Sequence, residues 1–152
     1  MLKIIEAKGN SMLHFICNGN KLIYDSEKYS IDVGDIVIYE VEGQKVAHRI
    51  LYIKGEQIIV AGDNCRKFEH INATKILGKV IILLKNNKRF KVSCNNTFRN
   101  ELVEFLREFI ILNDKYIDFV LLNQYGPEYE KCLELYRNRN IKQQKYLESV
   151  EI

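Results

Sequence analysis

The sequence predicts a mainly β fold, a folded-over sheet or small barrel, with a C-terminal α-helical extension, so that the fold class is α+β overall. Two observations support this prediction. Between residues 2 and 94, short apolar runs alternate with turns rich in glycine and asparagine, which is typical of strands and hairpins. After Thr97 the apolar residues recur at helical spacing. This change of period divides the chain into a β domain, residues 1–95, and a helical extension, residues 96–152.

The clearest apolar runs of the first domain predict its strands. They are rich in β-branched and aromatic residues, which favour a pleated backbone, and turn residues separate them. Several of them are apolar on both faces, as expected for strands that are buried on both sides. These runs span residues 35–41, 45–53, 57–62, 75–84 and 89–93.

Two segments of the extension predict helices. In the first, apolar residues recur three and four positions apart, which places them on one helical face. The second, residues 125–140, has a proline and glutamates near its start and arginines towards its end, in agreement with the helix dipole. A shorter apolar segment, residues 117–121, lies between them. The apolar face of the first segment consists of Phe98, Leu102, Phe105, Leu106, Phe109 and Ile110.

The composition argues against several classes of protein. The 23 basic and 20 acidic residues are mixed along the chain and leave a net charge of only +3, which argues against a nucleic-acid partner. The four cysteines are scattered without a C-x-x-C pair, so we expect reduced thiols, no zinc site and no cofactor. No secretory signal and no apolar span of ~20 residues is visible. We therefore expect a soluble, cytoplasmic protein without a transmembrane anchor; membrane contact and oligomeric state stay open.

Four short motifs in the β domain contain residues that carry chemistry in other proteins. Each has an ordinary explanation when it stands alone. A serine after Gly-Asn is usually a turn residue, Gly-Asp is a common strand entry or turn, and a histidine within an apolar strand usually packs in the core. The motifs are "GNSM" (9–12), "VGDIVIYE" (33–40), "VAHRIL" (46–51) and "AGDN" (61–64).

The order and spacing of these motifs resemble those of the type I signal peptidases and the LexA-like serine peptidases. The resemblance is closest to the endoplasmic-reticulum-type branch, in which a histidine in an H-R-V/I motif takes the place of the catalytic lysine. Two further segments agree with the pattern, "NGNKLIY" (18–24) and "ILGKVI" (76–81). The resemblance covers residues 5–82 and implies a signal-peptidase-like β catalytic domain.

The resemblance implies a catalytic role for three residues. Ser11 would be the nucleophile and His48 its general base, because an imidazole with a pKa of about 6.5 can accept the hydroxyl proton and later deliver it to the leaving amine. Asp63 would orient the imidazole and stabilise the imidazolium, as the third member of a triad does.

Further residues of the same motifs would support the site. Backbone N–H groups around Ser11 would form the oxyanion hole, with Gly9 and Met12 shaping the loop. Three more residues, Asp35, Gly62 and Arg49, match the family pattern next to the catalytic positions, and we expect structural support from them.

The chain also departs from the family pattern. His14 stands where the family usually has a proline, two residues after the Ser-Met pair, and it offers a second imidazole near Ser11. "GNK" replaces the usual Gly-Asp at residues 19–20. Signal peptidases carry a membrane segment before the serine, whereas only ten residues precede Ser11, a layout closer to that of the soluble members.

The resulting expectation is a soluble serine endopeptidase that cleaves a specific peptide or protein precursor, for example by removing a leader during peptide maturation. The substrate would bind as an extended, added strand. The alternative is a non-catalytic peptide-binding module that retains the signal-peptidase fold. A self-cleaving regulator ranks last, because the small-residue pairs of the chain lie within predicted strands.

Overall fold

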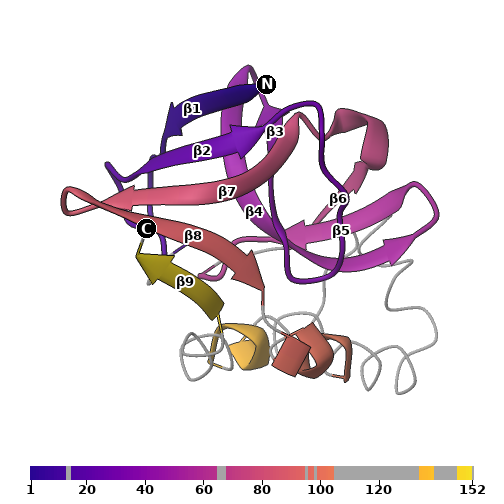
Figure 1. Ribbon diagram of the computed structural model, residues 1–152. Coiled ribbons are helices and arrows are strands. Elements are labelled where there is room, and N and C mark those ends of the chain that lie inside the picture. Colours follow the sequence, from indigo (N-terminus) through magenta and orange to yellow (C-terminus); the bar gives the residue numbers. More distant parts are fainter. Residues whose placement is uncertain are drawn as a thin grey trace.

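The computed structural model describes residues 1–12, 15–64, 68–94, 96–97, 99–104, 134–138 and 147–151. Within these residues nine strands form a mainly antiparallel sheet, with the order β1-β2-β7-β3-β4-β5-β6, while β8 extends it from β7 and β9 from β8 (Figure 1). The strands are β1 (Leu2–Glu6), β2 (Lys21–Asp25), β3 (Ile36–Val41), β4 (Gln44–Lys54), β5 (Gln57–Ala61), β6 (Glu69–Asn72), β7 (Gly78–Lys85), β8 (Lys88–Cys94) and β9 (Leu147–Glu151).

The apolar runs of the β domain form strands, as predicted. They correspond to β3, β4, β5, β7 and β8. The predicted run 75–84 begins three residues before the strand β7 itself, because Ala73–Lys75 forms a 3₁₀ turn. The Asn72 side chain caps this turn by accepting from the N–H of Thr74. The short strand β6 was not predicted separately, since "EHIN" lacks the apolar alternation of a typical strand.

Strand β4 changes its partner halfway along its length. Residues 44–49 pair with β3, and residues 49–54 pair with β5, with a register shift between Ile50 and Tyr52. Such a bulge bends a strand and increases its twist. The sheet therefore folds over on itself, and β5 and β6 turn away from β1 and β2 (Figure 1).

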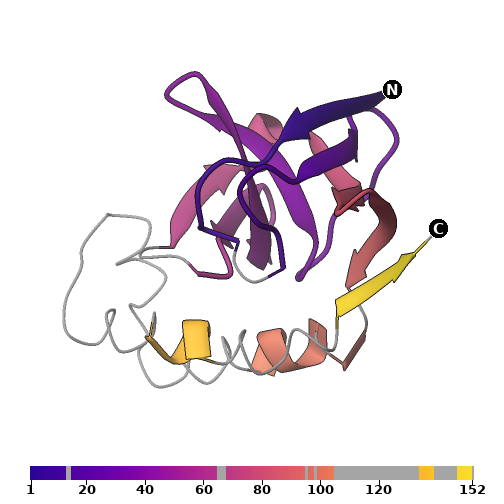
Figure 2. The same cartoon turned by 90° about the vertical axis from the view of Figure 1, so that its left-hand side faces the viewer.

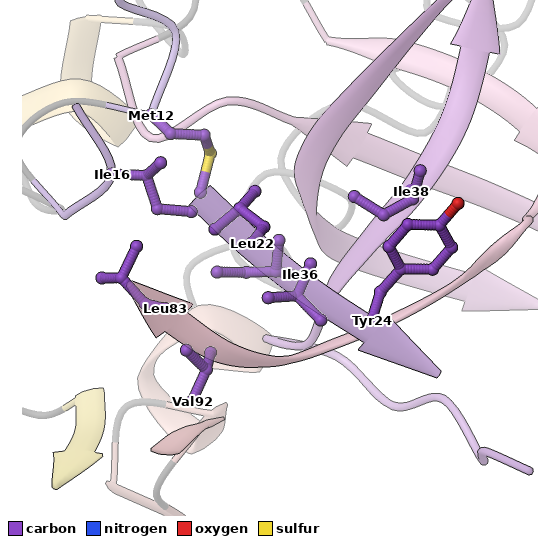
Figure 3. Close-up of a cluster of buried hydrophobic side chains, with 9 residues drawn as sticks. Met12, Ile16, Leu22, Tyr24, Ile36, Ile38, Leu83 and Val92 are labelled. Carbon is purple, nitrogen blue, oxygen red and sulfur yellow. The ribbon is translucent and has the colours of Figure 1, made fainter. Parts of the chain in front are cut away.

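The buried core has two parts, one on each side of β3. Ile36 and Ile38 point into the first part and Val37 and Tyr39 into the second, because successive side chains of a strand alternate between its faces. This explains why the run "DIVIYEV" is apolar on both faces. The first part consists of Met12, Ile16, Leu22, Tyr24, Ile36, Ile38, Val80, Leu83 and Val92, most of which Figure 3 labels.

The described parts of the extension lie beside the β domain (Figure 2). Residues 96–97, 99–104 and 134–138 are helical, in agreement with the prediction, and Leu102 and Tyr136 are fully buried. Phe105, Leu106, Phe109, Ile110 and the segment 117–121 lie outside the described residues. No described helix has both the length and the apolar character that crossing a bilayer requires.

The sequence predicted a helical extension over residues 96–152, but the described part of the extension also contains a strand. Its last described residues form β9, which pairs antiparallel with β8 through contacts such as Val92 opposite Ser149. The segment "LESVE" is too short and too polar to be recognised as a strand by itself. It becomes one because β8 offers a free edge whose backbone groups need partners.

The extension also contacts the β domain through side chains. Arg99 donates from Nε to the carbonyl of Val33 at 2.7 Å and forms an ion pair with Asp35 at 3.2 Å. The rings of Phe68 and Tyr136 meet edge to face, with their centroids 5.3 Å apart. These contacts attach the first and the second helical segments to different parts of the β domain.

Candidate active site

Ser11 lies on the connection between β1 and β2, where several contacts hold the backbone. The side chain of Met12 is buried in the core, and its sulfur accepts a hydrogen bond from the N–H of Asp63 at 3.3 Å. The N–H of Asn64 donates to the carbonyl oxygen of Ser11 at 2.7 Å. The "GNSM" and "GDN" motifs are therefore bonded directly to each other.

Two glycines permit this arrangement. Gly9 has a φ of +81°, a left-handed conformation that glycine adopts without strain. At Gly62, a Cβ atom would collide with the carbonyl oxygen of Ser11 and would lie 2.9 Å from its Cβ. Only a residue without a side chain lets the two loops approach so closely.

His48 lies on β4 and faces the serine. Its Nε2 is 3.2 Å from the Oγ of Ser11, which is hydrogen-bond distance. Burial lowers the pKa of His48 below the ordinary value of 6.5, whereas the negative charges of Glu69 and Asp63 raise it. The net lowering favours a neutral imidazole at pH 7, the form that can accept a proton.

The other ring nitrogen of His48 contacts a tyrosine that the sequence analysis did not select. The hydroxyl of Tyr39 is 2.8 Å from Nδ1 of His48, and it also donates to Oε2 of Glu69 at 2.8 Å. Tyr39 is buried on β3, and Glu69 is partly buried on β6. Tyr39 stands within the "VGDIVIYE" motif, but in an apolar strand it resembles a core residue; Glu69 follows the last motif and carries no signal of its own.

Asp63 lies in a different position from the one expected of a third triad member. Both of its carboxylate oxygens accept from Arg49, each at 2.7 Å, and both side chains are 1% exposed. Arg49 also donates to the carbonyl of Gly34 at 2.7 Å. Among the described residues, Asp63 has no hydrogen bond to His48, and its charge acts on the imidazole from a distance.

Asp35 stands directly before β3 and has polar partners of its own. Its carboxylate accepts from the N–H of Asp32 at 2.8 Å and forms ion pairs with Lys79 and Arg99, both at 3.2 Å. The N–H of Ile50 donates to the Asp35 carbonyl at 2.8 Å. These contacts join β3, β4, β7 and the extension. His14, the second imidazole near the serine, lies outside the described residues.

A groove with a volume of about 670 Å³ opens beside Ser11. Residues 5–9 form one wall, and residues 43–47 of the β3–β4 hairpin form the other. Among the described strands, β1 pairs only with β2, and residues 44–48 of β4 pair only with β3. Each wall therefore offers one free backbone edge.

Residues 1–81 match a family model described as Peptidase S24-like. A search of curated proteins found no match. The match spans the "GNSM", "VGDIVIYE", "VAHRIL" and "AGDN" motifs and ends within β7, so it contains both members of the Ser11–His48 contact. It covers more than half of the 152 residues, and the chain accordingly belongs to the Peptidase S24-like family, within the superfamily of LexA and the signal peptidases, a membership that indicates serine peptidase chemistry.

Proposed function

We propose that this protein is a serine endopeptidase in which Ser11 is the nucleophile and His48 the general base. The observation that carries the proposal is the 3.2 Å distance between Ser11 Oγ and His48 Nε2. A serine hydroxyl is a weak nucleophile at neutral pH, and a neutral imidazole at this distance can activate it. Family membership supports the same reaction class.

The reaction would proceed in two steps. The Oγ of Ser11 attacks the scissile carbonyl while its proton moves to Nε2 of His48, and the same proton then passes to the leaving amine as the C–N bond breaks. A water molecule, deprotonated in turn by His48, attacks the resulting acyl-serine ester, and His48 returns that proton to the Oγ of Ser11 as the C–O bond breaks. Backbone N–H groups around Ser11 would bind the oxyanion.

The groove supports a peptide substrate in extended conformation. Its two walls carry free strand edges, so a peptide backbone could bond to residues 5–9 and to residues 43–47 on its two sides. Ser11 lies at the same groove and would meet a peptide carbonyl there. We propose a specific peptide or protein precursor as the substrate, cleaved in the cytoplasm during peptide maturation.

The histidine at position 48 supports assignment to the endoplasmic-reticulum-type branch. In the lysine-type branch the base is a single amine, which needs no partner on a second nitrogen. Here Nε2 faces the serine and Nδ1 contacts Tyr39, so both nitrogens have the partners that a histidine base requires. The branch assignment depends on this residue rather than on the family match.

The test is cleavage of a complex peptide mixture, since the substrate is not identified. The purified full chain is incubated with peptides from a partial digest of a cell extract, and new termini are identified by mass spectrometry. We expect Ser11→Ala and His48→Ala to abolish the new termini and His70→Ala, an exposed histidine on β6, to leave them unchanged.

A non-catalytic peptide-binding module is the second candidate, because two free strand edges would serve binding as well as cleavage. The same experiment separates the two functions. A binding module would retain peptides without cleaving them, and the Ser11→Ala and wild-type proteins would then give identical mixtures.

A further inference from the structure

Four side chains form a continuous line of hydrogen bonds that ends in a carboxylate. Ser11 Oγ lies 3.2 Å from His48 Nε2, His48 Nδ1 lies 2.8 Å from the Tyr39 hydroxyl, and that hydroxyl lies 2.8 Å from Glu69 Oε2. The four residues come from the β1–β2 connection, β4, β3 and β6. In the sheet order β4 and β5 separate β6 from β3. Glu69 on β6 can therefore reach Tyr39 on β3 only because the sheet folds over on itself.

The number of protons available to these hydrogen bonds determines which tautomer the neutral His48 ring adopts. An ionised carboxylate can only accept hydrogen bonds, so the single hydroxyl proton of Tyr39 is donated to Glu69. The oxygen of Tyr39 then has only lone pairs to offer His48, and Nδ1 must carry the ring proton. Nε2 is left unprotonated and faces Ser11, in the tautomer that a general base needs.

Glu69 is the residue that determines in which direction the Tyr39 hydroxyl donates its hydrogen bond. Without its charge, the Tyr39 hydroxyl could turn and donate to Nδ1. The ring proton would then move to Nε2, and the nitrogen that faces Ser11 could no longer accept. Among the residues that the structure describes, Glu69 and Asp63 are the charged groups that act on His48, and Asp63 is already bonded through both oxygens to Arg49.

We propose that Tyr39 and Glu69 are positioning residues that hold His48 in the base-competent tautomer and stabilise its imidazolium, in the place where a triad carboxylate would stand; this inference rests on the proposed function. As the proton of Ser11 reaches Nε2, the imidazolium keeps its Nδ1–H bond to Tyr39, and Tyr39 keeps its bond to Glu69. The carboxylate thus faces the new positive charge through one intervening hydroxyl.

The first test measures the tautomer directly and does not need a substrate. The full chain is labelled with ¹⁵N at its histidine rings, and His48→Ala identifies the His48 signals. At pH 8 the wild-type protein should show a protonated Nδ1 and an unprotonated Nε2. In Tyr39→Phe the proton should move largely to Nε2, and in Glu69→Gln both tautomers should be populated. An unchanged tautomer in both variants would overturn the proposal, even if the protein cleaved no peptide at all.

The second test uses the cleavage reaction. Tyr39→Phe keeps the buried ring, and we expect kcat to fall by about tenfold to a hundredfold. This is at or below the lower end of the roughly 10²–10⁴-fold that general base catalysis contributes, because His48 itself is still present. Because Glu69 acts through Tyr39, the double variant should be no slower than Tyr39→Phe alone. Additive losses would indicate two independent structural effects. Tyr52→Phe and Glu56→Gln, on β4 and in the β4–β5 turn, are the matched controls.

Discussion

Arg49 and Asp63 form an ion pair with two parallel contacts of 2.7 Å, and both side chains are almost completely buried. The pair joins β4, directly after His48, to the loop whose N–H groups bond to Met12 and Ser11. It therefore sets the distance between the strand that carries the base and the loop that carries the nucleophile.

This arrangement predicts a structural consequence for Asp63→Ala. The variant leaves a buried guanidinium without its carboxylate, which costs about 3–5 kcal/mol in proteins. We expect a fall of that size in the free energy of unfolding, measured by urea denaturation. Glu27→Ala is the control: the Glu27 side chain is 63% exposed, and its loss should change the free energy of unfolding by less than about 0.5 kcal/mol. A large loss of cleavage rate at unchanged stability would instead assign Asp63 to the reaction itself.

The pH dependence of cleavage should follow His48. Protonated imidazole cannot accept the proton of Ser11, so kcat/KM falls as the pH drops through the pKa of His48. Burial lowers that pKa below 6.5, and we therefore expect activity to persist below pH 6.5. In Glu69→Gln a charge that raises the pKa is lost, and the acidic limb should move to still lower pH. A limb that stays in place would show that Glu69 does not act on His48.

The lowered pKa of His48 also makes the folding stability depend on pH. Because the pKa of His48 is lower in the folded than in the unfolded protein, the unfolded chain binds the proton more readily. The contribution of His48 is complete above pH 6.5 and is lost as the pH falls below that value. His48→Gln should reduce the loss of stability between pH 7 and pH 5, as measured by thermal unfolding.

The sequence alone was sufficient to select Ser11 and His48, because each stands in a short motif and the motifs occur in a known order. It could not reveal Tyr39 as a polar partner, since in "DIVIYEV" a tyrosine satisfies the same apolar alternation as a valine. Glu69 depends on the bend of β4, which no local pattern records. The strand β9 was missed for a related reason, because its pairing with β8 joins residues more than fifty positions apart.

Arg99 should determine how firmly the extension is attached. Its side chain donates to the carbonyl of Val33 and pairs with Asp35, and both partners lie in the turn directly before β3. Arg99→Ala removes these contacts, and we expect stability to fall by roughly 1–2 kcal/mol, the range for hydrogen bonds to charged groups. Limited proteolysis should also cut after residue 94 sooner than in the wild type. Arg89→Ala, an exposed arginine on β8, is the control.

Gly62→Ala adds only one methyl group, but it should lower the catalytic rate. The new Cβ would collide with backbone and Cβ atoms of Ser11, which cannot rotate away as the end of a flexible side chain could. The two loops must separate, and the Ser11–His48 distance of 3.2 Å must change with them. Since a displacement of about 1 Å at a catalytic group can lower the rate a hundredfold, we expect kcat to fall by at least tenfold.

Gly55→Ala provides the comparison for this substitution. A Cβ at Gly55 meets no atom of the described residues within 4 Å, so the positive φ of +61° is what opposes the change. That strain costs about 1–2 kcal/mol and lies in the β4–β5 turn, where the added Cβ has no contact with Ser11. Both variants should therefore lose stability in urea denaturation, but only Gly62→Ala should lose kcat. Equal activity of the two variants would mean that the contact between the "GNSM" and "GDN" loops does not position the nucleophile.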